Sequence, residues 1–538
     1  MTDPMNVLRQ GLTYGVSLNA CQKVVSFTLN QLLVRWTSPA VFGLASIQLE
    51  LLLSTLLFLS REGVRLALLR ETVTTLDQRQ RFVNLSWVPA LVLCAMSALV
   101  LLWQNLNTQS AGAVVAMYCL GALAEALGEP WVNAYQNSSL VAPKMQAETT
   151  AVFAKSATTL VTVALWDMGI VGFGIAQIVY GTVYLVVLVG YYQAANFSSC
   201  SAAPHMRLVD FFPRIAILDS NDYVGSDREQ GNFFGVRALS VALTATSSGL
   251  LKHILTEADK IVLSLARSSF DQGIFAVANN YASLVVRIFF LPLEDSARVA
   301  FSKFAINLES TRETRQNRQA ILESQDLFVL LMRVVGAVGV LFPIFGPSYV
   351  SLAVRLCMGS MWQGPEIEKT LKAFCYYIFV LGLNGISEAY YYVIAASATS
   401  GFGTLNAGLI ASSIVYAIVA LLLINNIGTS GIVWAGTAAM IVRIISSLVF
   451  ISRNIAQRSG VPLIASLLPS QFQAATMLLA ASLCHISSIR NVVPGLRLAS
   501  VVEHLLVGSL AFGTLGLLHR KAIWKTFSRL LINRSKIH

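Results

Sequence analysis

The sequence predicts an all-α polytopic membrane protein with about fourteen transmembrane helices. Apolar residues make up 55% of the 538 positions, charged residues make up only 12%, and the mean hydropathy is +0.65. Average soluble domains have about twice that share of charged residues. Windows of about 20 mostly apolar residues, long enough to cross the hydrocarbon core as a helix, recur along nearly the whole chain.

The predicted spans fall into three groups. The first six, joined by short loops, are Leu12–Val34, Phe42–Ser60, Leu85–Leu106, Ala111–Leu127, Thr149–Trp166 and Ile170–Tyr191. A long polar stretch precedes the next six, which are Arg237–Ala266, Gln272–Leu293, Asp326–Phe345, Glu366–Ala395, Phe402–Ile424 and Gly428–Phe450. The last two, Phe472–Ile489 and Val501–Leu518, are followed by a basic tail.

The distribution of Lys and Arg predicts the orientation. Alternate loops and the tail are rich in Lys and Arg, whereas most of the facing loops have none, which indicates cytosolic loops on the basic side and both termini in the cytosol. The net charge of +11 then reflects topology and attraction to anionic membrane lipid, and it gives no reason to expect nucleic-acid binding. No signal peptide is visible at the start. The four N-glycosylation sequons, at Asn84, Asn137, Asn196 and Asn533, all fall on the predicted cytosolic side.

A weak internal repeat predicts two lobes. The order Arg35, Gly43, Glu62 around the second span is repeated as Arg267, Gly273, Glu294 around the eighth. Such repeats are common in transporters and imply two parallel six-helix lobes. The predicted parts are an N-terminal lobe over 1–195, a cytosolic connecting loop over 196–236, a C-terminal lobe over 237–455, and two extra helices with the basic tail over 456–538.

Ionisable residues inside predicted spans are the candidate functional residues, because such charges are costly against lipid and are expected to face a bundle interior or a watery cavity. The candidates for a central, substrate-binding cavity are Arg35, Lys252, Glu257, Lys260, Arg287, Arg333, Glu388 and Arg443. Those for the cytosolic mouth are Arg61, Glu62, Arg65, Glu294 and Arg298. The structural alternative is that single positions form ion pairs that hold helices together or, at the mouth, enforce topology. Glu125 and Glu129 fit either a cavity lining or a helix end.

Catalytic signatures are missing from the sequence. There is no Gly-rich phosphate loop ending in Gly-Lys-Ser/Thr, no metalloprotease pair of His residues and no Gly-x-Ser-x-Gly elbow. The seven cysteines give no disulfide or metal-binding framework. We therefore expect a protein that is not an enzyme, with no cofactor and no metal.

Four long segments resemble one known family. They are FLSREGVRLAL after the second span, LLKHILTEADK in the seventh, VRIFFLPLEDSARVAFSK through the eighth and GPEIEKTLKAFCYYIFVLGLNGISEAYYYV in the tenth. They are similar to the eukaryotic oligosaccharide-lipid translocation family of the endoplasmic reticulum, in the multidrug/oligosaccharidyl-lipid/polysaccharide exporter superfamily. The resemblance implies a two-lobed fold like that of multidrug exporters. It also implies a role in bringing dolichol-pyrophosphate-linked oligosaccharide to the luminal leaflet for N-glycosylation, by moving the lipid or by assisting its movement.

The residues fit that role and leave two alternatives. A pyrophosphate head group needs cations, and Arg pairs with phosphate oxygens bidentately, while the dolichol tail can stay in the lipid. An ion-coupled exporter of small molecules with the same fold would use embedded carboxylates more than cations. A scaffold or chaperone for assembly of the lipid-linked oligosaccharide would need the embedded charges only for stability. Protein partners are not predicted.

Overall fold

The computed structural model describes residues 27–69, 71, 73, 76–106, 112–138, 140, 142–194, 211–214, 234, 236–302, 315–396, 401–453, 470–491 and 498–534. This part of the chain contains helices and no strand, which confirms the all-α class. Within it, twelve helices are long and apolar enough to cross a membrane. They coincide with twelve of the predicted spans. Leu12–Val34 lies mostly outside the described residues, and Thr149–Trp166 is helical but not among the twelve, so the number fourteen stays a prediction.

The chain forms two compact units, Met1–Gly273 and Ile274–His538, called unit 1 and unit 2 below. The described helices of unit 1 are α2 (Pro39–Gly43), η1 (Leu44–Leu49), α3 (Glu50–Leu57), η2 (Phe58–Glu62), α4 (Gly63–Leu69), α5 (Leu76–Ser86), α6 (Val88–Leu106), α7 (Gly112–Ala126), α8 (Glu129–Asn137), α9 (Ala142–Leu160), η3 (Val161–Leu165), α10 (Gly169–Ala194), α11 (Val236–Thr256), α12 (Ala258–Ala266) and the start of α13 (Ser269–Val285). A further helical stretch covers residues 27–36.

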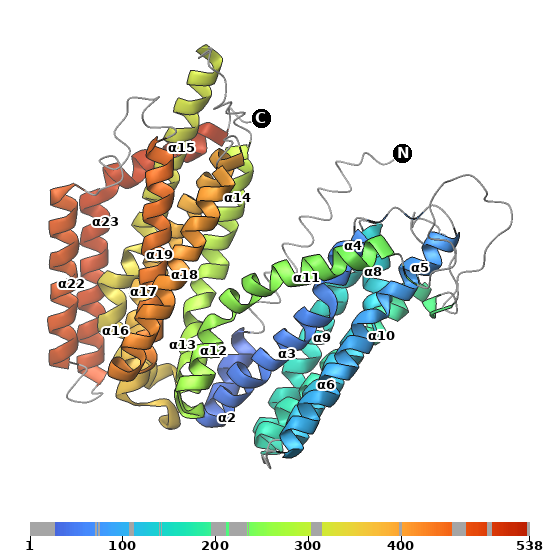
Figure 1. The fold of residues 1–538 in the computed structure, drawn as a ribbon. Helices are drawn as coiled ribbons and strands as arrows, with labels where there is room; N and C mark the ends of the chain where they lie inside the picture. The colour runs from blue at the N-terminus through green and yellow to red at the C-terminus, as the bar shows by residue number, and fades with distance from the viewer. Residues whose placement is uncertain are drawn as a thin grey trace. The chain divides into compact units, whose positions relative to one another are not determined.

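Unit 2 continues from α13. It contains η5 (Val286–Phe290), α14 (Leu291–Ser302), α15 (Arg315–Gly339), α16 (Leu341–Cys357), η6 (Ser360–Trp362), α17 (Pro365–Ala396), α18 (Gly401–Ile427), α19 (Thr429–Ile451), α22 (Gln471–Asn491) and α23 (Leu498–Arg534). Helix α17 is the centre of this unit, since α14, α15, α16, α18 and α19 all pack against it (Figure 1). In unit 1 the corresponding role belongs to α10, which packs against α7, α8 and α9.

Helix α11 packs against α4 within unit 1. The ring of His253 on α11 stacks on Phe58 with centroids 4.3 Å apart, and its Nε2 lies 3.3 Å from the hydroxyl of Thr55. The boundary between the compact units, after Gly273, therefore lies further along the chain than the boundary between the predicted lobes, which is the loop over 196–236. The lobe boundaries stay a prediction.

The C-terminal helices α22 and α23 are joined to unit 2 through α16. His504 on α23 is fully buried, and its two ring nitrogens lie 2.9 Å from the hydroxyl of Ser487 on α22 and 3.2 Å from the carbonyl of Ser348 on α16. Tyr349 of α16 stacks on the His504 ring and donates a hydrogen bond to its carbonyl, 2.7 Å away. Because one buried imidazole links all three helices, the C-terminal pair is an integral part of unit 2.

Four short π-helical turns interrupt the helices of the described chain: η1, η2, η3 and η5. Such turns are rare and occur frequently at functional sites. Two of them contain candidate residues, since Arg61 and Glu62 lie in η2 and Arg287 lies in η5. A third, η1, ends directly before Glu50. Charged candidates and irregular helix geometry therefore coincide.

Gly43 and Gly273, the glycines matched by the predicted repeat, pack against each other's segments in unit 1. A Cβ on Gly43 would collide with the backbone of Ser269 and Gly273, and a Cβ on Gly273 would collide with the backbone of Pro39. Pro39 stands four residues before Gly43, as Ser269 does before Gly273. Each glycine therefore packs against the residue four positions before the other glycine. A two-fold axis that relates the two segments would produce such a matched pair of contacts. The repeat and the superposition of its two halves stay predictions.

The segment Phe211–Arg214, from the predicted connecting loop, is fixed on unit 1. Phe211 is 1% exposed and stacks on Trp131 of α8, with centroids 5.2 Å apart. Its carbonyl accepts a hydrogen bond from Nε1 of Trp87, at 2.6 Å. The amide of Asn84 on α5 donates to the carbonyl of Arg214 at 2.8 Å and accepts from its N–H at 3.0 Å. An Asn side chain thus replaces a backbone partner and holds the loop in place.

The contact between Gly43 and Gly273 leads to a test. We expect Gly43→Ala to destabilise the protein by about 1–3 kcal/mol, because the added methyl group forces packed backbone apart. The matched control is Gly190→Ala, at an exposed position of α10 with nothing within 4 Å of the added Cβ. It should be neutral or stabilising, since Ala is the better helix former by up to about 1 kcal/mol. Thermal unfolding followed by size-exclusion chromatography in detergent measures both, and equal melting temperatures would contradict the close contact.

The sequons provide a second test. Asn84 is 1% exposed and uses its amide for the loop, and Asn137 donates to the carbonyls of Leu68 and Glu71 at 3.1 and 2.9 Å. Asn196 lies outside the described residues. We expect no glycan at Asn84 or Asn137, both because these side chains are engaged and because the predicted topology places them in the cytosol. A glycosidase-sensitive mass shift that disappears in Asn84→Gln or Asn137→Gln would overturn the topology.

Candidate functional site

Two of the three arginines of the predicted cytosolic mouth, Arg61 and Arg65, form a largely buried quartet with two glutamates in unit 1. Arg61 of η2 pairs with Glu125 of α7 and lies 3.7 Å from Glu129 of α8. Arg65 of α4 binds Glu129 bidentately, with Nε to Oε2 at 2.8 Å and Nη2 to Oε1 at 2.6 Å. The Glu129 side chain is 0% exposed. Two cations and two carboxylates cancel, so these arginines are held by counter-ions.

The quartet answers the question that the sequence left open for Glu125 and Glu129. Arg61 and Arg65 stand four residues apart, and so do Glu125 and Glu129. The two arginines lie in the continuous helical stretch Pro39–Leu69 and the two glutamates in Gly112–Asn137. Residues four apart lie on one face of a helix, so two adjacent stretches with this spacing can form two rungs of opposite charge. The equal spacing of the two arginines and the two glutamates was the feature of the sequence from which this pairing could have been predicted. Glu62, between the two arginines, is exposed and has no ion pair in the described part of the chain.

A second polar group in unit 1 contains two residues that the sequence analysis missed. Lys155 of α9 lies 2.8 Å from Oε1 of Glu50, and its ammonium stands 5.8 Å from the centroid of the Tyr180 ring. Lys260 of α12 pairs with Glu257 at 2.8 Å and also acts electrostatically on Glu50. Both missed residues lie well inside predicted spans, so the rule that selected Glu257 would also have found them.

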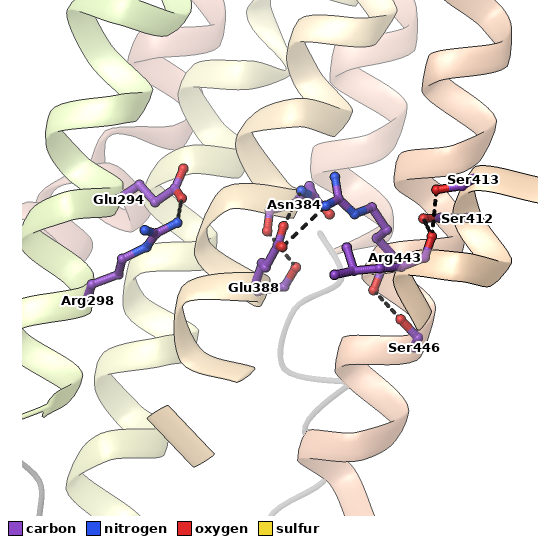
Figure 2. A network of polar contacts seen from close by, with 10 residues as sticks. Glu294, Arg298, Asn384, Glu388, Ser412, Ser413, Arg443 and Ser446 are labelled. Atoms are coloured by element: carbon purple, nitrogen blue, oxygen red, sulfur yellow. Dashed lines mark hydrogen bonds and ion pairs between the residues drawn. The ribbon is translucent and has the colours of Figure 1, made fainter. Parts of the chain in front are cut away.

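Unit 2 contains a polar network on α14, α17 and α19 (Figure 2). Glu388 of α17 accepts a hydrogen bond from Asn384 at 3.0 Å and pairs with Arg443 of α19 at 3.4 Å. On α14, Glu294 pairs with Arg298, whose guanidinium stands 5.9 Å from the centre of the Tyr392 ring. The structure therefore joins the predicted candidates Glu388 with Arg443 and Glu294 with Arg298.

The pair between Arg443 and Glu388 leaves hydrogen-bonding capacity unused. Nε of Arg443 and Oδ1 of Asn384 are buried and have no hydrogen-bond partner within the described part of the chain. A guanidinium has five N–H donors, and this one is held by a single contact of 3.4 Å. Arg443 is therefore less firmly bound to its counter-ion than Arg65, which has two shorter contacts.

Three predicted cavity cations have no counter-ion among the described residues: Arg35 in the helix over 27–36, Lys252 on α11 and Arg287 in η5. All three are exposed, as is Arg333 on α15. Arg35 and Lys252 belong to unit 1, while Arg287, Arg333 and Arg443 belong to unit 2. Their convergence on one central cavity therefore stays a prediction.

Comparison with known proteins identifies relatives along nearly the whole chain. The family profile described as Rft protein (Rft-1) matches residues 8–523. Relatives named Man(5)GlcNAc(2)-PP-dolichol translocation protein RFT1 include one from Xenopus tropicalis, 26% identical, with 89% of this chain and 88% of the relative covered. The protein of that name from Mus musculus is 28% identical, with 81% and 80% covered, and that from Saccharomyces cerevisiae is 26% identical, with 78% and 79% covered.

Solved structures show the same fold. A structure titled lipid II flippase MurJ in an inward closed conformation matches with a TM-score of 0.57 at 11% identity and covers 95% of this chain and 100% of its own. An inward-facing multidrug transporter of the MATE family, in the MOP superfamily, matches with a TM-score of 0.52 at 13% identity, with 83% and 99% covered. The chain therefore has a fold like those of MurJ and MATE transporters, as the sequence resemblance implied.

The buried quartet leads to a test of stability. We expect Glu129→Ala to lower the free energy of unfolding by about 3 kcal/mol, because it leaves the largely enclosed Arg65 without its counter-ion. The neighbouring Glu62→Ala, which removes an exposed carboxylate, should change it by less than about 0.5 kcal/mol. Thermal unfolding and protein level in cells measure both. The double variant Arg65→Met with Glu129→Leu should recover much of the loss, and a stable Glu129→Ala would show that the quartet is not structural.

Proposed function

Because the chain belongs to the Rft protein family, we propose that it moves dolichol-pyrophosphate-linked oligosaccharide from the cytosolic to the luminal leaflet of the endoplasmic reticulum membrane, or supports that movement, for N-glycosylation. The observation that carries the proposal is the match of this chain over most of its length to relatives named for Man(5)GlcNAc(2)-PP-dolichol translocation. The fold shared with a lipid II flippase is in keeping with it. Both termini are proposed to lie in the cytosol.

The unpaired cations support a role in binding the head group. A pyrophosphate carries several negative charges that must be compensated before it can leave water. Arg35, Lys252 and Arg287 are exposed, and none has a counter-ion in the part of the chain that the structure describes. Cations that are already in place when the anion arrives stabilise it without reorganisation. The sugar chain and pyrophosphate would pass between the two lobes, while the dolichol tail stays in the lipid.

Arg443 would act differently from these three. Glu388 holds it in the absence of substrate through a single 3.4 Å contact, while Asn384 donates a second hydrogen bond to Glu388. A pyrophosphate can compete for Arg443, because phosphate oxygens accept two hydrogen bonds from a guanidinium. Glu388 would then keep its bond from Asn384. The exchange lowers the penalty of carrying an unpaired Arg443 between transport cycles.

The scaffold reading has one observation in its favour. Within the described residues, Arg61, Arg65 and Lys155 each pair with a carboxylate on another helix, as charges that hold helices together would. The deciding measurement is leaflet exchange of a defined dolichol-pyrophosphate oligosaccharide in vesicles that contain the purified protein. Exchange faster than in protein-free vesicles supports translocation. No acceleration, together with loss of oligosaccharide-lipid assembly in cells that lack the protein, would support the scaffold.

Substitution of the cations tests the site. We expect Arg287→Ala and Arg443→Ala to reach normal protein levels but to lose most of their ability to complement glycosylation of a reporter glycoprotein, because each removes a phosphate ligand and no core packing. Arg287→Lys should rescue only partly, since an ammonium lacks the planar fork. An immunoblot for protein level accompanies the reporter assay. Full complementation by both alanine variants would contradict the proposal that these arginines bind the head group. Loss of protein level in parallel with loss of activity would indicate that the arginines stabilise the fold instead.

A further inference from the structure

We infer that unit 1 carries a separate site for the uncharged sugars of the head group, formed by Glu50, Lys155, Glu257 and Lys260, called the neutral row below. The inference rests on the proposed function and deepens it, because it assigns a contact for the glycan that is distinct from the cations proposed for the pyrophosphate. Two of its members, Glu50 and Lys155, come from helices that the site prediction did not include.

The row is built from three parts of unit 1. Glu50 begins α3 immediately after the π turn η1, Lys155 comes from α9, and Glu257 with Lys260 stands at the junction of α11 and α12. Helix α12 packs against η1, which brings Lys260 toward Glu50. Next to the row, Gln48 of η1 donates a hydrogen bond to Gln272 at 3.0 Å. Lys155 pairs with Glu50 and Lys260 pairs with Glu257, and the packing of α12 against η1 brings these two pairs of opposite charge into one region of unit 1.

The row is more accessible than the quartet. The side chains of Glu50, Lys155 and Lys260 are 37%, 25% and 34% exposed, and only Glu257, at 13%, is as enclosed as Arg65 of the quartet, while Glu129 of the quartet is 0% exposed. Glu50 and Lys155 lie well inside predicted spans, where a charge that faced lipid would be strongly disfavoured. Partly exposed charges at such positions are expected to face water, so a polar ligand can reach them.

The row also has unused hydrogen-bonding capacity. An ammonium has three donors, and a carboxylate has about four acceptor positions. Among the described residues, the ion-pair contacts of the row are Lys155 with Glu50 and Lys260 with Glu257, each a single contact of 2.8 Å. Arg65 and Glu129, by contrast, use two matched donor and acceptor pairs. The row can therefore take further hydrogen bonds without losing its ion pairs.

The chemistry of the row suits sugar hydroxyls better than phosphate. Two carboxylates and two ammonium groups sum to zero, so an anion gains no net attraction, and the carboxylates repel it at short range. A hydroxyl both donates and accepts, and the row offers both acceptors and donors. Tyr180 beside Lys155 and the partly buried amide of Gln48 add further polar groups, whereas Gln272 is fully buried and its amide is bonded to Gln48 and to the carbonyls of Leu263 and Arg267. A glycan thus matches the row, whereas a pyrophosphate matches Arg35 and Lys252, which have no counter-ion among the described residues.

The test compares two lipids that differ only in their glycan. Both are short-chain polyprenyl pyrophosphates; one carries GlcNAc2 and the other Man5GlcNAc2, the head group in the names of the relatives. Affinities are measured for the full-length protein in nanodiscs. We expect Glu50→Gln with Lys155→Gln to weaken binding of the Man5GlcNAc2 lipid about tenfold, as loss of one or two hydrogen bonds would, and to change binding of the GlcNAc2 lipid less than about twofold.

The control variant is Glu366→Gln with Lys369→Gln, which removes a pair of the same type in unit 2, at 3.5 Å, outside the row. It should leave both affinities unchanged. If the row variant fails to fold, Glu50→Asp with Lys155→Arg is measured in its place. This variant keeps both charges but moves the donor and acceptor atoms, and the quantity compared is again the ratio of the affinities for the Man5GlcNAc2 and GlcNAc2 lipids.

The outcomes separate the two proposals. If the row variant weakens both lipids equally or neither, the row is not a glycan site, and the proposed function stands. If the unaltered protein binds neither lipid, the proposed function fails and the row with it. Selective loss of the Man5GlcNAc2 lipid supports the row.

Discussion

The structure depends on one constraint: an ionised side chain inside a membrane must either be matched by a counter-ion or remain in water. Desolvating a carboxylate or guanidinium costs several kcal/mol even after the protein relaxes. The described charges meet this constraint to different degrees. Glu129 is fully buried, Arg65 is 13% exposed, and the two side chains bind each other twice. Lys155 and Glu50 share one contact and stay partly exposed, and Arg287 is exposed with no counter-ion in the described chain. We interpret this gradation as a division between charges that hold helices together and charges that are free for a ligand.

The fold class followed from the sequence because bilayer thickness dictates helix length. A run such as Thr429–Ile451 has one stable form in lipid, and the sequence predicted it to within a residue at each end. The region around α9 was harder, because this helix combines Lys144, Glu148 and Lys155 with apolar residues and passes into the π turn η3. For such a helix, amino-acid composition alone does not distinguish a transmembrane helix from a polar helix outside the membrane.

The site was less accessible to prediction than the fold. The rule that embedded charges are functional selected Arg443 and Glu388, which the structure joins, but it does not say which charges meet. Partners such as Arg61 and Glu125 lie 64 positions apart in the sequence, and their contact depends on how α7 packs beside η2 and α4. By contrast, pairs of residues three or four positions apart can be predicted from the sequence alone. Glu294 with Arg298, and Glu257 with Lys260, follow from a spacing of four or three residues.

The π-helical turns have a mechanical consequence. A π turn accommodates one more residue than the α-helix around it, so every side chain on one side of it is rotated by roughly 100° relative to an uninterrupted helix. The turn η5 could move along its helix if hydrogen bonds switched one at a time between the α and π patterns. The side chains of the residues it passed would then rotate to a different face of the helix, while both helix ends stayed in place. Arg287 lies inside η5 and Arg61 inside η2. A guanidinium at such a position can change the direction in which it points through local rewinding of the backbone, which requires neither unfolding nor displacement of a whole helix.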